Sequence, residues 1–188
     1  MRVAIFASGN GSNFEVLAQA FQAKKIAGNL VLLFCDHPDA YVIERAKKYK
    51  IKTVSFTVKE CGGKGLYEKK IAQLLEQENI DFIALAGYMR VIGPLILSKY
   101  EGKIVNIHPA YLPEYPGLHS IERALADGKQ KTGVTIHYID SGVDSGPIIA
   151  QEHVAILADD TLETLEQRVH ACEHRMYPRV LAQILEKR

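Results

Sequence analysis

Short apolar runs alternate with amphipathic stretches through the first half of the chain, and no other feature constrains the fold as strongly. The apolar runs lie at 2–7, 30–35, 53–56 and 81–86, and each has the length and composition of a strand buried in a parallel sheet. A stretch with apolar residues at helical spacing, or a short segment opened by Pro94, follows each run. Four βα units in succession predict an α/β fold: a doubly wound, mostly parallel, Rossmann-like sheet with helices on both faces.

The second half opens with a fifth predicted strand, which begins at Lys103 and carries Asn106 and His108 at its end. Pro109 ends this strand because proline has no backbone N–H to donate. A loop crowded with Pro and Gly follows at 110–119, and we expect it to be shaped rather than flexible. Polar side chains at the carboxyl end of a strand in an open α/β sheet lie where ligands bind.

The last third of the chain predicts an antiparallel hairpin and a long helix. Residues 132–139 alternate polar and apolar side chains, a turn rich in Gly and Asp follows at 140–146, and 147–156 has the pattern of a returning strand. Asp160, with Glu163 at capping-box spacing, is expected to open the C-terminal helix.

The loop after the first strand, Ser8–Asn13, contains Gly9 and Gly11 and leads directly into a helix. Free N–H groups at a helix start attract an anion such as a phosphate. The structural alternative is a capping box between Ser12 and Glu15, with the glycines needed only for the turn. A dinucleotide site is a further alternative because Asp36 lies near the position of a ribose-binding acid, but the third glycine of GxGxxG is missing, which favours a monophosphate.

Composition limits the partners that the chain can be expected to have. With 188 residues and no biased spacer, we expect one domain, and a formal charge of +1 gives no reason to expect nucleic acid or a membrane surface. Cys35, Cys61 and Cys172 are odd in number and have no CxxC spacing, which is typical of reduced thiols in the cytoplasm. No apolar run approaches the roughly 18 residues of a membrane span. We therefore expect a cytoplasmic protein, monomeric or homodimeric, that acts on small molecules.

The chemistry that we expect depends on Asn106, His108 and Asp144 lying together. A carboxylate near an imidazole raises the His pKa, and imidazolium and carboxamide are two donors that can stabilise one developing oxyanion. This set favours acyl transfer, and because no Ser or Cys is evidently paired with His108, direct attack by a substrate amine is the natural route. Metal ligation by His108, His119 and His137 is the rival chemistry, but their spacing matches no familiar motif.

Several motifs then occur in an order that resembles a known family. They are Ala7–Asn13, Asn106–Pro109, Leu112-Pro113, Tyr115–Ser120, His137, Asp144–Pro147, Glu173-His174 and Tyr177-Pro178. Together they resemble the formyltetrahydrofolate-dependent formyltransferases over essentially the whole chain, most closely the branch that acts on phosphoribosylglycinamide in purine biosynthesis. The resemblance implies one formyltransferase domain, 1–188, with a phosphate-binding βα half at 1–100 and a catalytic and folate-binding half at 101–188.

The resemblance also implies roles for particular residues, with 10-formyltetrahydrofolate as co-substrate and no metal. The catalytic groups would be Asn106, His108 and Asp144. The substrate phosphate would lie on Gly11, Ser12 and Asn13, and Glu173 would contact the glycinamide substrate. The folate would contact Lys64, Met89, Arg90, Val91, Ile92, Asp140 and Val143.

This chain departs from the family pattern at three places, and other functions have to be weighed. Lys64 stands where arginine is common, Ala110-Tyr111 replaces a usual Ser-Leu, and Ser145 replaces a usual glycine. The alternatives are a formyltetrahydrofolate hydrolase, a methionyl-tRNA formyltransferase and a non-catalytic nucleotide-binding module. The first two would be expected to carry a further domain, and the third leaves Asn106, His108 and Asp144 without a purpose.

Overall fold

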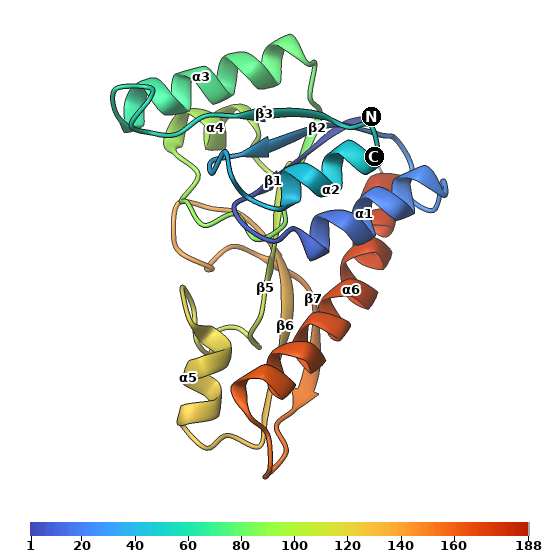
Figure 1. The fold of residues 1–188 in the computed structure, drawn as a ribbon, viewed down its shortest axis with the longest axis vertical. Coiled ribbons are helices and arrows are strands. Elements are labelled where there is room, and N and C mark those ends of the chain that lie inside the picture. Colours follow the sequence, from blue (N-terminus) through green and yellow to red (C-terminus); the bar gives the residue numbers. More distant parts are fainter. Residues whose placement is uncertain (188) are drawn as a thin grey trace.

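Seven strands form one sheet in the computed structural model, which describes residues 1–187 (Figure 1). They are β1 (Arg2–Ala7), β2 (Asn29–Cys35), β3 (Lys52–Ser55), β4 (Phe82–Leu85), β5 (Ile104–His108), β6 (Lys131–Tyr138) and β7 (Ile148–Ala155). Their order in space is β3-β2-β1-β4-β5-β6-β7. The strands β1 to β5 pair in parallel, whereas β6 is antiparallel to β5 and to β7, so the predicted fold class and hairpin are confirmed.

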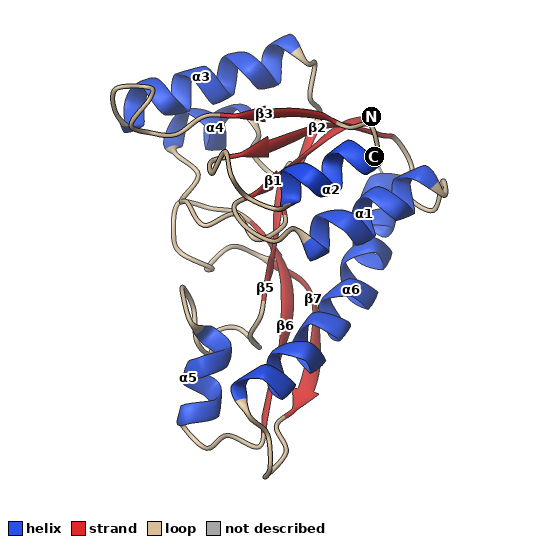
Figure 2. Cartoon of the chain, viewed as in Figure 1, coloured by secondary structure: helices blue, strands red, loops and turns tan. Residues whose placement is uncertain are grey.

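Helices cover both faces of this sheet (Figure 2). They are α1 (Ser12–Gln22), α2 (Val42–Lys48), α3 (Lys64–Gln77), α4 (Pro94–Lys99), α5 (Ser120–Ala126) and α6 (Leu162–Glu186). In β1, Val3 and Ile5 belong to the core shared with α1, α2 and α6, while Ala4 and Phe6 belong to the core shared with α3 and α4. Because successive side chains of a strand point to opposite faces, this double burial explains why the strand is apolar throughout.

The helix starts differ from the sequence predictions in an instructive way. Gly11, at a φ of 79°, caps α1 without any side-chain hydrogen bond, and Glu15 instead forms an ion pair with Arg45 of α2. The capping-box alternative for Ser12 and Glu15 is therefore wrong. The helix α6 does begin with a capping box, but Thr161 and Thr164 make it, one residue later than predicted.

The order of the strands creates the place where a site can form. The chain leaves β1 toward one side of the sheet and leaves its neighbour β4 toward the other, so the loops after these strands diverge. Such a divergence at the carboxyl ends of parallel strands is the usual position of a ligand crevice. On one side, the buried hydroxyl of Tyr177 in α6 donates a hydrogen bond of 2.7 Å to the carbonyl of Leu85 and so ties this helix to the end of β4.

Candidate active site

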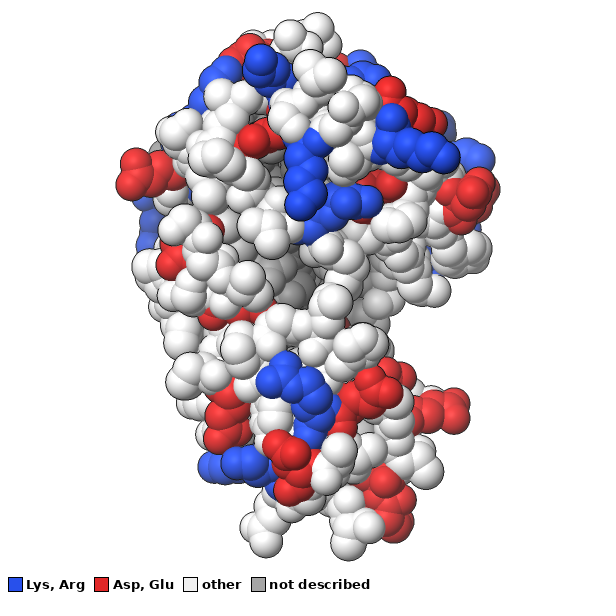
Figure 3. Space-filling model, turned by 90° about the vertical axis from the view of Figure 1, so that its left-hand side faces the viewer, with Lys and Arg blue, Asp and Glu red and all other residues white. Residues whose placement is uncertain are grey.

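A cleft of about 790 Å³ opens at the carboxyl ends of β1, β4 and β5. Its walls come from the loop after β1, the loop 86–92 after β4, residues 117–122, the turn 139–144 and α6. Figure 3 shows this side of the molecule hollowed between an upper and a lower part, with mostly uncharged residues in the hollow. The volume lies within the range of small-molecule sites.

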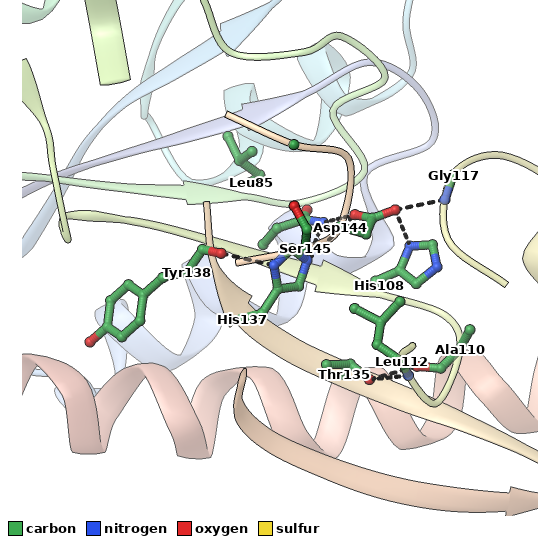
Figure 4. Close-up of polar contacts among 12 residues, drawn as sticks. Leu85, His108, Ala110, Leu112, Gly117, Thr135, His137, Tyr138, Asp144 and Ser145 are labelled. Carbon is green, nitrogen blue, oxygen red and sulfur yellow. Dashed lines mark hydrogen bonds and ion pairs between the residues drawn. The ribbon is translucent and has the colours of Figure 1, made fainter. Parts of the chain in front are cut away.

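Asp144 joins the polar side chains at the end of β5, as the sequence predicted (Figure 4). Its Oδ2 lies 3.3 Å from Nδ1 of His108 and accepts a hydrogen bond of 2.8 Å from the backbone N–H of Gly117. Its Oδ1 lies 3.4 Å from Nδ2 of Asn106 and 3.4 Å from Nε2 of His137. One carboxylate thus links two imidazoles, a carboxamide and the Pro-rich loop.

The charge state expected for His108 has to be corrected. The pKa of His108 lies below its usual value because burial disfavours the imidazolium more strongly than Asp144 favours it. Its Nε2 lies 2.8 Å from the carbonyl oxygen of Tyr115, so both ring nitrogens face acceptors. Only a doubly protonated ring satisfies both acceptors, whereas burial opposes that charge.

The carboxyl group of Asp144 is ionised at neutral pH. Burial alone would raise its pKa, but hydrogen bonds from His137 and Gly117 and the nearby imidazole of His108 outweigh burial and lower the pKa to about 2. The site therefore holds a fixed negative charge beside Asn106 and His108.

His137 is the site residue whose role sequence reasoning missed. It lies on β6 directly opposite Asn106 of β5, and Nδ2 of Asn106 is 3.3 Å from its Nε2. Residues directly opposite each other in an antiparallel pair point to the same face. From the sequence alone, His137 is only a rival metal ligand and part of the family resemblance; aligning the polar positions of these two strands would have placed it beside Asn106.

The phosphate-binding residues predicted from the sequence line the same cleft. Gly11, Ser12 and Asn13 form the start of α1 along one wall, and Glu173 of α6 faces them. The buried Glu173 carboxylate accepts hydrogen bonds from Nδ2 of Asn13, at 3.1 Å, and from Nδ1 of His170, at 2.7 Å. This bond to Glu173 raises the pKa of His170. Within the described residues Oδ1 of Asn13 is buried without a partner, which leaves an acceptor for a donor group of a ligand.

We expect Gly11→Ala to destabilise the fold by about 2 to 5 kcal/mol, because two costs add. Gly11 has a positive φ of 79°, and a Cβ built there would lie 2.3 Å from Cγ2 of Val42. Denaturant unfolding of the purified variant measures the loss. Gly65→Ala is the matched control, since Gly65 lies in α3 with open space around it, and alanine there should change stability by less than about 1 kcal/mol. An unchanged free energy of unfolding for Gly11→Ala would contradict the left-handed backbone at this position.

The residues assigned to folate are not all in the cleft. A second part of the cleft lining is formed by Met89, Arg90, Val91, Ile92, Asp140 and Val143. Met89, Val91 and Val143 are exposed there, which leaves apolar surface for a flat ring. Lys64 is exposed at the start of α3 and is not among the lining residues.

The structure offers no ready support for the rival metal chemistry. Within residues 1–187 no group of three or more His, Cys, Asp or Glu side chains is arranged to hold a metal ion. His119 instead pairs with Glu122 on the surface, with 2.8 Å between Nδ1 and Oε2. Across the same residues, no helix combines the length and the apolar character needed to cross a membrane.

Comparison with known proteins decides the family. The family model described as formyl transferase matches residues 1–181. This chain belongs to the formyl transferase family. The phosphoribosylglycinamide formyltransferase of Bacillus subtilis (strain 168) is 46% identical to this formyl transferase over 184 residues, which are 98% of this chain and 94% of the relative. The enzyme of the same name from Escherichia coli (strain K12) is 34% identical over 97% of this chain and 86% of its own length.

Solved structures agree with this family membership. The crystal structure of phosphoribosylglycinamide formyltransferase from Bacillus halodurans is 50% identical to this chain and superposes on it with a TM-score of 0.96. The match covers 100% of this chain and 96% of that one. The predicted resemblance to formyltransferases and the prediction that the chain is an enzyme are thus confirmed. Formyl transfer is the reaction class of this formyl transferase.

Proposed function

We propose that this enzyme transfers the formyl group of 10-formyltetrahydrofolate to the amine of phosphoribosylglycinamide, a step of purine biosynthesis. The observation that carries the proposal is the meeting of Asn106, His108 and Asp144 in the cleft that is also lined by the start of α1. The 46% identity to a relative of that name over nearly the whole chain supports the choice of substrates.

The start of α1 is the place for the substrate phosphate. Backbone N–H groups of Ser12 and Asn13 have no partners within the first turn of a helix, and the helix dipole favours an anion there. Glu173 and the unpartnered Oδ1 of Asn13 supply acceptors for hydroxyl or amide donors of the same substrate. The phosphate and the reactive amine would therefore lie along one wall of the cleft, with the amine toward Asn106.

The folate ring fits the part of the lining formed by the loop 87–92 and the turn 139–144, the folate wall. Exposed Met89, Val91 and Val143 offer apolar contact, and Asp140 and the backbone of loop 87–92 offer polar groups for the ring edges. Lys64 lies outside the cleft, so any contact that it makes would be with the far end of the folate. The single domain of 1–188 would thus bind phosphate with its first half and carry the catalytic groups on its second.

The amine nitrogen attacks the formyl carbon, and the carbonyl oxygen takes up the negative charge. Asn106 Nδ2 stabilises this oxyanion together with His108, which takes up a proton from solvent as the substrates bind and returns it when the oxyanion collapses. Asp144 stabilises the imidazolium. The bond between the formyl carbon and N10 then breaks. The amine loses one proton and N10 gains one, through a water near Asp144, so the products are tetrahydrofolate and the formylated amide.

Donation by His108 requires a local change around its ring. Nε2 faces the carbonyl of Tyr115 and Nδ1 faces Asp144, so neither nitrogen points freely at the oxyanion. Because Tyr115 belongs to the loop 110–119, a shift of this loop on substrate binding would free Nε2. The developing oxyanion then replaces the carbonyl as the acceptor and favours the charged ring.

Two measurements test the proposal. Tetrahydrofolate release should require phosphoribosylglycinamide and should match the amount of formylated amide formed. Release that proceeds equally without the amine would indicate a hydrolase instead. Each substrate should also raise the thermal midpoint of the protein, whereas a pure nucleotide-binding module would respond to the nucleotide and ignore the folate.

A further inference from the structure

Asp36 is a buried carboxylate that the proposed mechanism does not use. It follows the last residue of β2, its side chain is 0% exposed, and it does not line the cleft. Ser8 Oγ donates a hydrogen bond of 2.6 Å to its Oδ1, and Nε of Arg90 donates one of 2.5 Å to its Oδ2. Nδ1 of His37 lies 3.0 Å from Oδ1. Two distant segments of the chain, at Ser8 and at Arg90, therefore converge on one carboxylate, next to its neighbour His37.

This cluster holds the backbone that forms the folate wall. The Ser8 hydroxyl that donates to Asp36 also accepts a hydrogen bond of 2.9 Å from the backbone N–H of Met89. The backbone N–H of Ser8 donates to the carbonyl of Gly87, at 3.0 Å. Asp36 thus holds the loop 87–92 at two points. It accepts a hydrogen bond from Ser8, which in turn accepts one from the backbone of Met89, and it accepts another from the side chain of Arg90 directly.

The side chain of Arg90 is committed to this contact. Its guanidinium meets Asp36 and lies over the ring of Tyr67, with 5.8 Å from Cζ to the ring centroid. Its Nε is taken up by Asp36, although the side chain is 37% exposed and lines the cleft. Burial alone would raise the pKa of Asp36, but hydrogen bonds from Ser8, His37 and Arg90 outweigh it and keep the pKa below its usual value. The carboxylate is thus ionised and fully partnered.

We propose that Asp36 is a positioning residue for the folate ring, which fixes the loop 87–92 through Ser8 and Arg90 without touching the ligand. This inference rests on the proposed function, since it assigns a role within that folate site. Removing its charge should loosen the loop 87–92, whereas Gly11, Ser12 and Asn13 at the start of α1 and the catalytic groups are not among the hydrogen-bond partners of Asp36 and should stay in place.

Asp36→Asn tests the proposal because it keeps the shape of the side chain and removes its charge. We expect KM for 10-formyltetrahydrofolate to rise on the order of 10-fold, as for the loss of a hydrogen bond between charged groups. KM for phosphoribosylglycinamide and kcat should each change less than about threefold on the same reasoning. A merely structural role would affect all three constants together. Calorimetric titration with tetrahydrofolate should show the same weakening.

Asp160→Asn is the matched control. Asp160 also pairs with an arginine, Arg168, at 2.6 Å, and its side chain is 3% exposed, but both residues lie outside the cleft. This variant should keep both KM values. Arg90→Gln, made alone and together with Asp36→Asn, provides a second test: it should raise the folate KM selectively, and the double variant should show no larger rise than the larger single one, because both act through one contact.

The outcomes separate this inference from the proposed function. An unchanged folate KM in both variants, or an equal rise for both substrates, would overturn the positioning role of Asp36. A wild-type protein that neither binds tetrahydrofolate nor uses the formyl donor would instead overturn the proposed function.

Discussion

Replacing His108 with alanine is expected to lower kcat for formyl transfer by about 10²- to 10³-fold, the usual cost of removing one oxyanion donor. His108 is the side chain in the cleft that can gain a proton as the substrates bind, because Asp144 lies 3.3 Å from its Nδ1. Without the imidazole, Asn106 alone would face the developing charge. The interaction exists only in the transition state, so KM for both substrates should change much less than kcat.

His153→Ala is the control for this variant. His153 stacks on Tyr111, with 3.8 Å between ring centroids, and does not line the cleft. It should keep kcat within about twofold, since no group at the reacting atoms is lost. If His108→Ala unfolds like the wild type and keeps near wild-type turnover, His108 does not stabilise the oxyanion.

Asp144→Asn is expected to lower kcat by about 10²- to 10⁴-fold, the range for loss of a group that controls proton transfer. Asparagine is similar in shape, so Gly117 and the turn can stay in place, but the charge that stabilises imidazolium is gone. Steady-state kinetics at saturating substrates measure the loss. Asp140→Asn gives a useful contrast, because Asp140 lies at the folate wall and its loss should raise the folate KM more than it lowers kcat.

Because the pKa of Asp144 is lowered in the folded protein, its ionised carboxylate stabilises the fold, and this stabilisation is lost at low pH. The folded-state pKa of about 2 lies below the usual value of 3.8, so the unfolded chain binds the proton first as the pH falls. The stabilisation from Asp144 is therefore fully present above about pH 4 and is lost between that pH and about 2. Asp144→Asn should flatten this part of the stability curve. An unchanged curve would show that the carboxylate is not held ionised by its neighbours.

The strand pattern and the polar ends of strands could be predicted from the sequence because both follow from local rules. Strand β1 is apolar throughout since both of its faces are buried, and Pro109 marks the end of β5. The meeting of Asp144 with His108 was predicted correctly from the order of the motifs. The distances between these side chains depend on the antiparallel register of β5 and β6, which the spacing of residues in the sequence does not give.

Tertiary contacts account for the predictions that were wrong or incomplete. Glu15 does not cap α1 because Arg45, from another helix, lies within reach of it. The pKa of His108 is lowered because of the depth of its burial, which no sequence pattern reports. Asp36 was noted as a possible ribose-binding acid, yet its partner is Arg90, brought from a distant loop by the order of the strands. The partners of Glu15 and Asp36 come from distant parts of the chain that no local pattern connects to them.

The measurement that tests the central claim most directly is a double-mutant cycle of His108→Ala and Asp144→Asn, with kcat determined from tetrahydrofolate release at saturating concentrations of both substrates. If the carboxylate acts through the imidazole, the double variant should be no more than about threefold slower than the slower single variant, because residues acting as a unit are not additive. Losses that multiply in the double variant would show that the two residues act independently and would contradict the account.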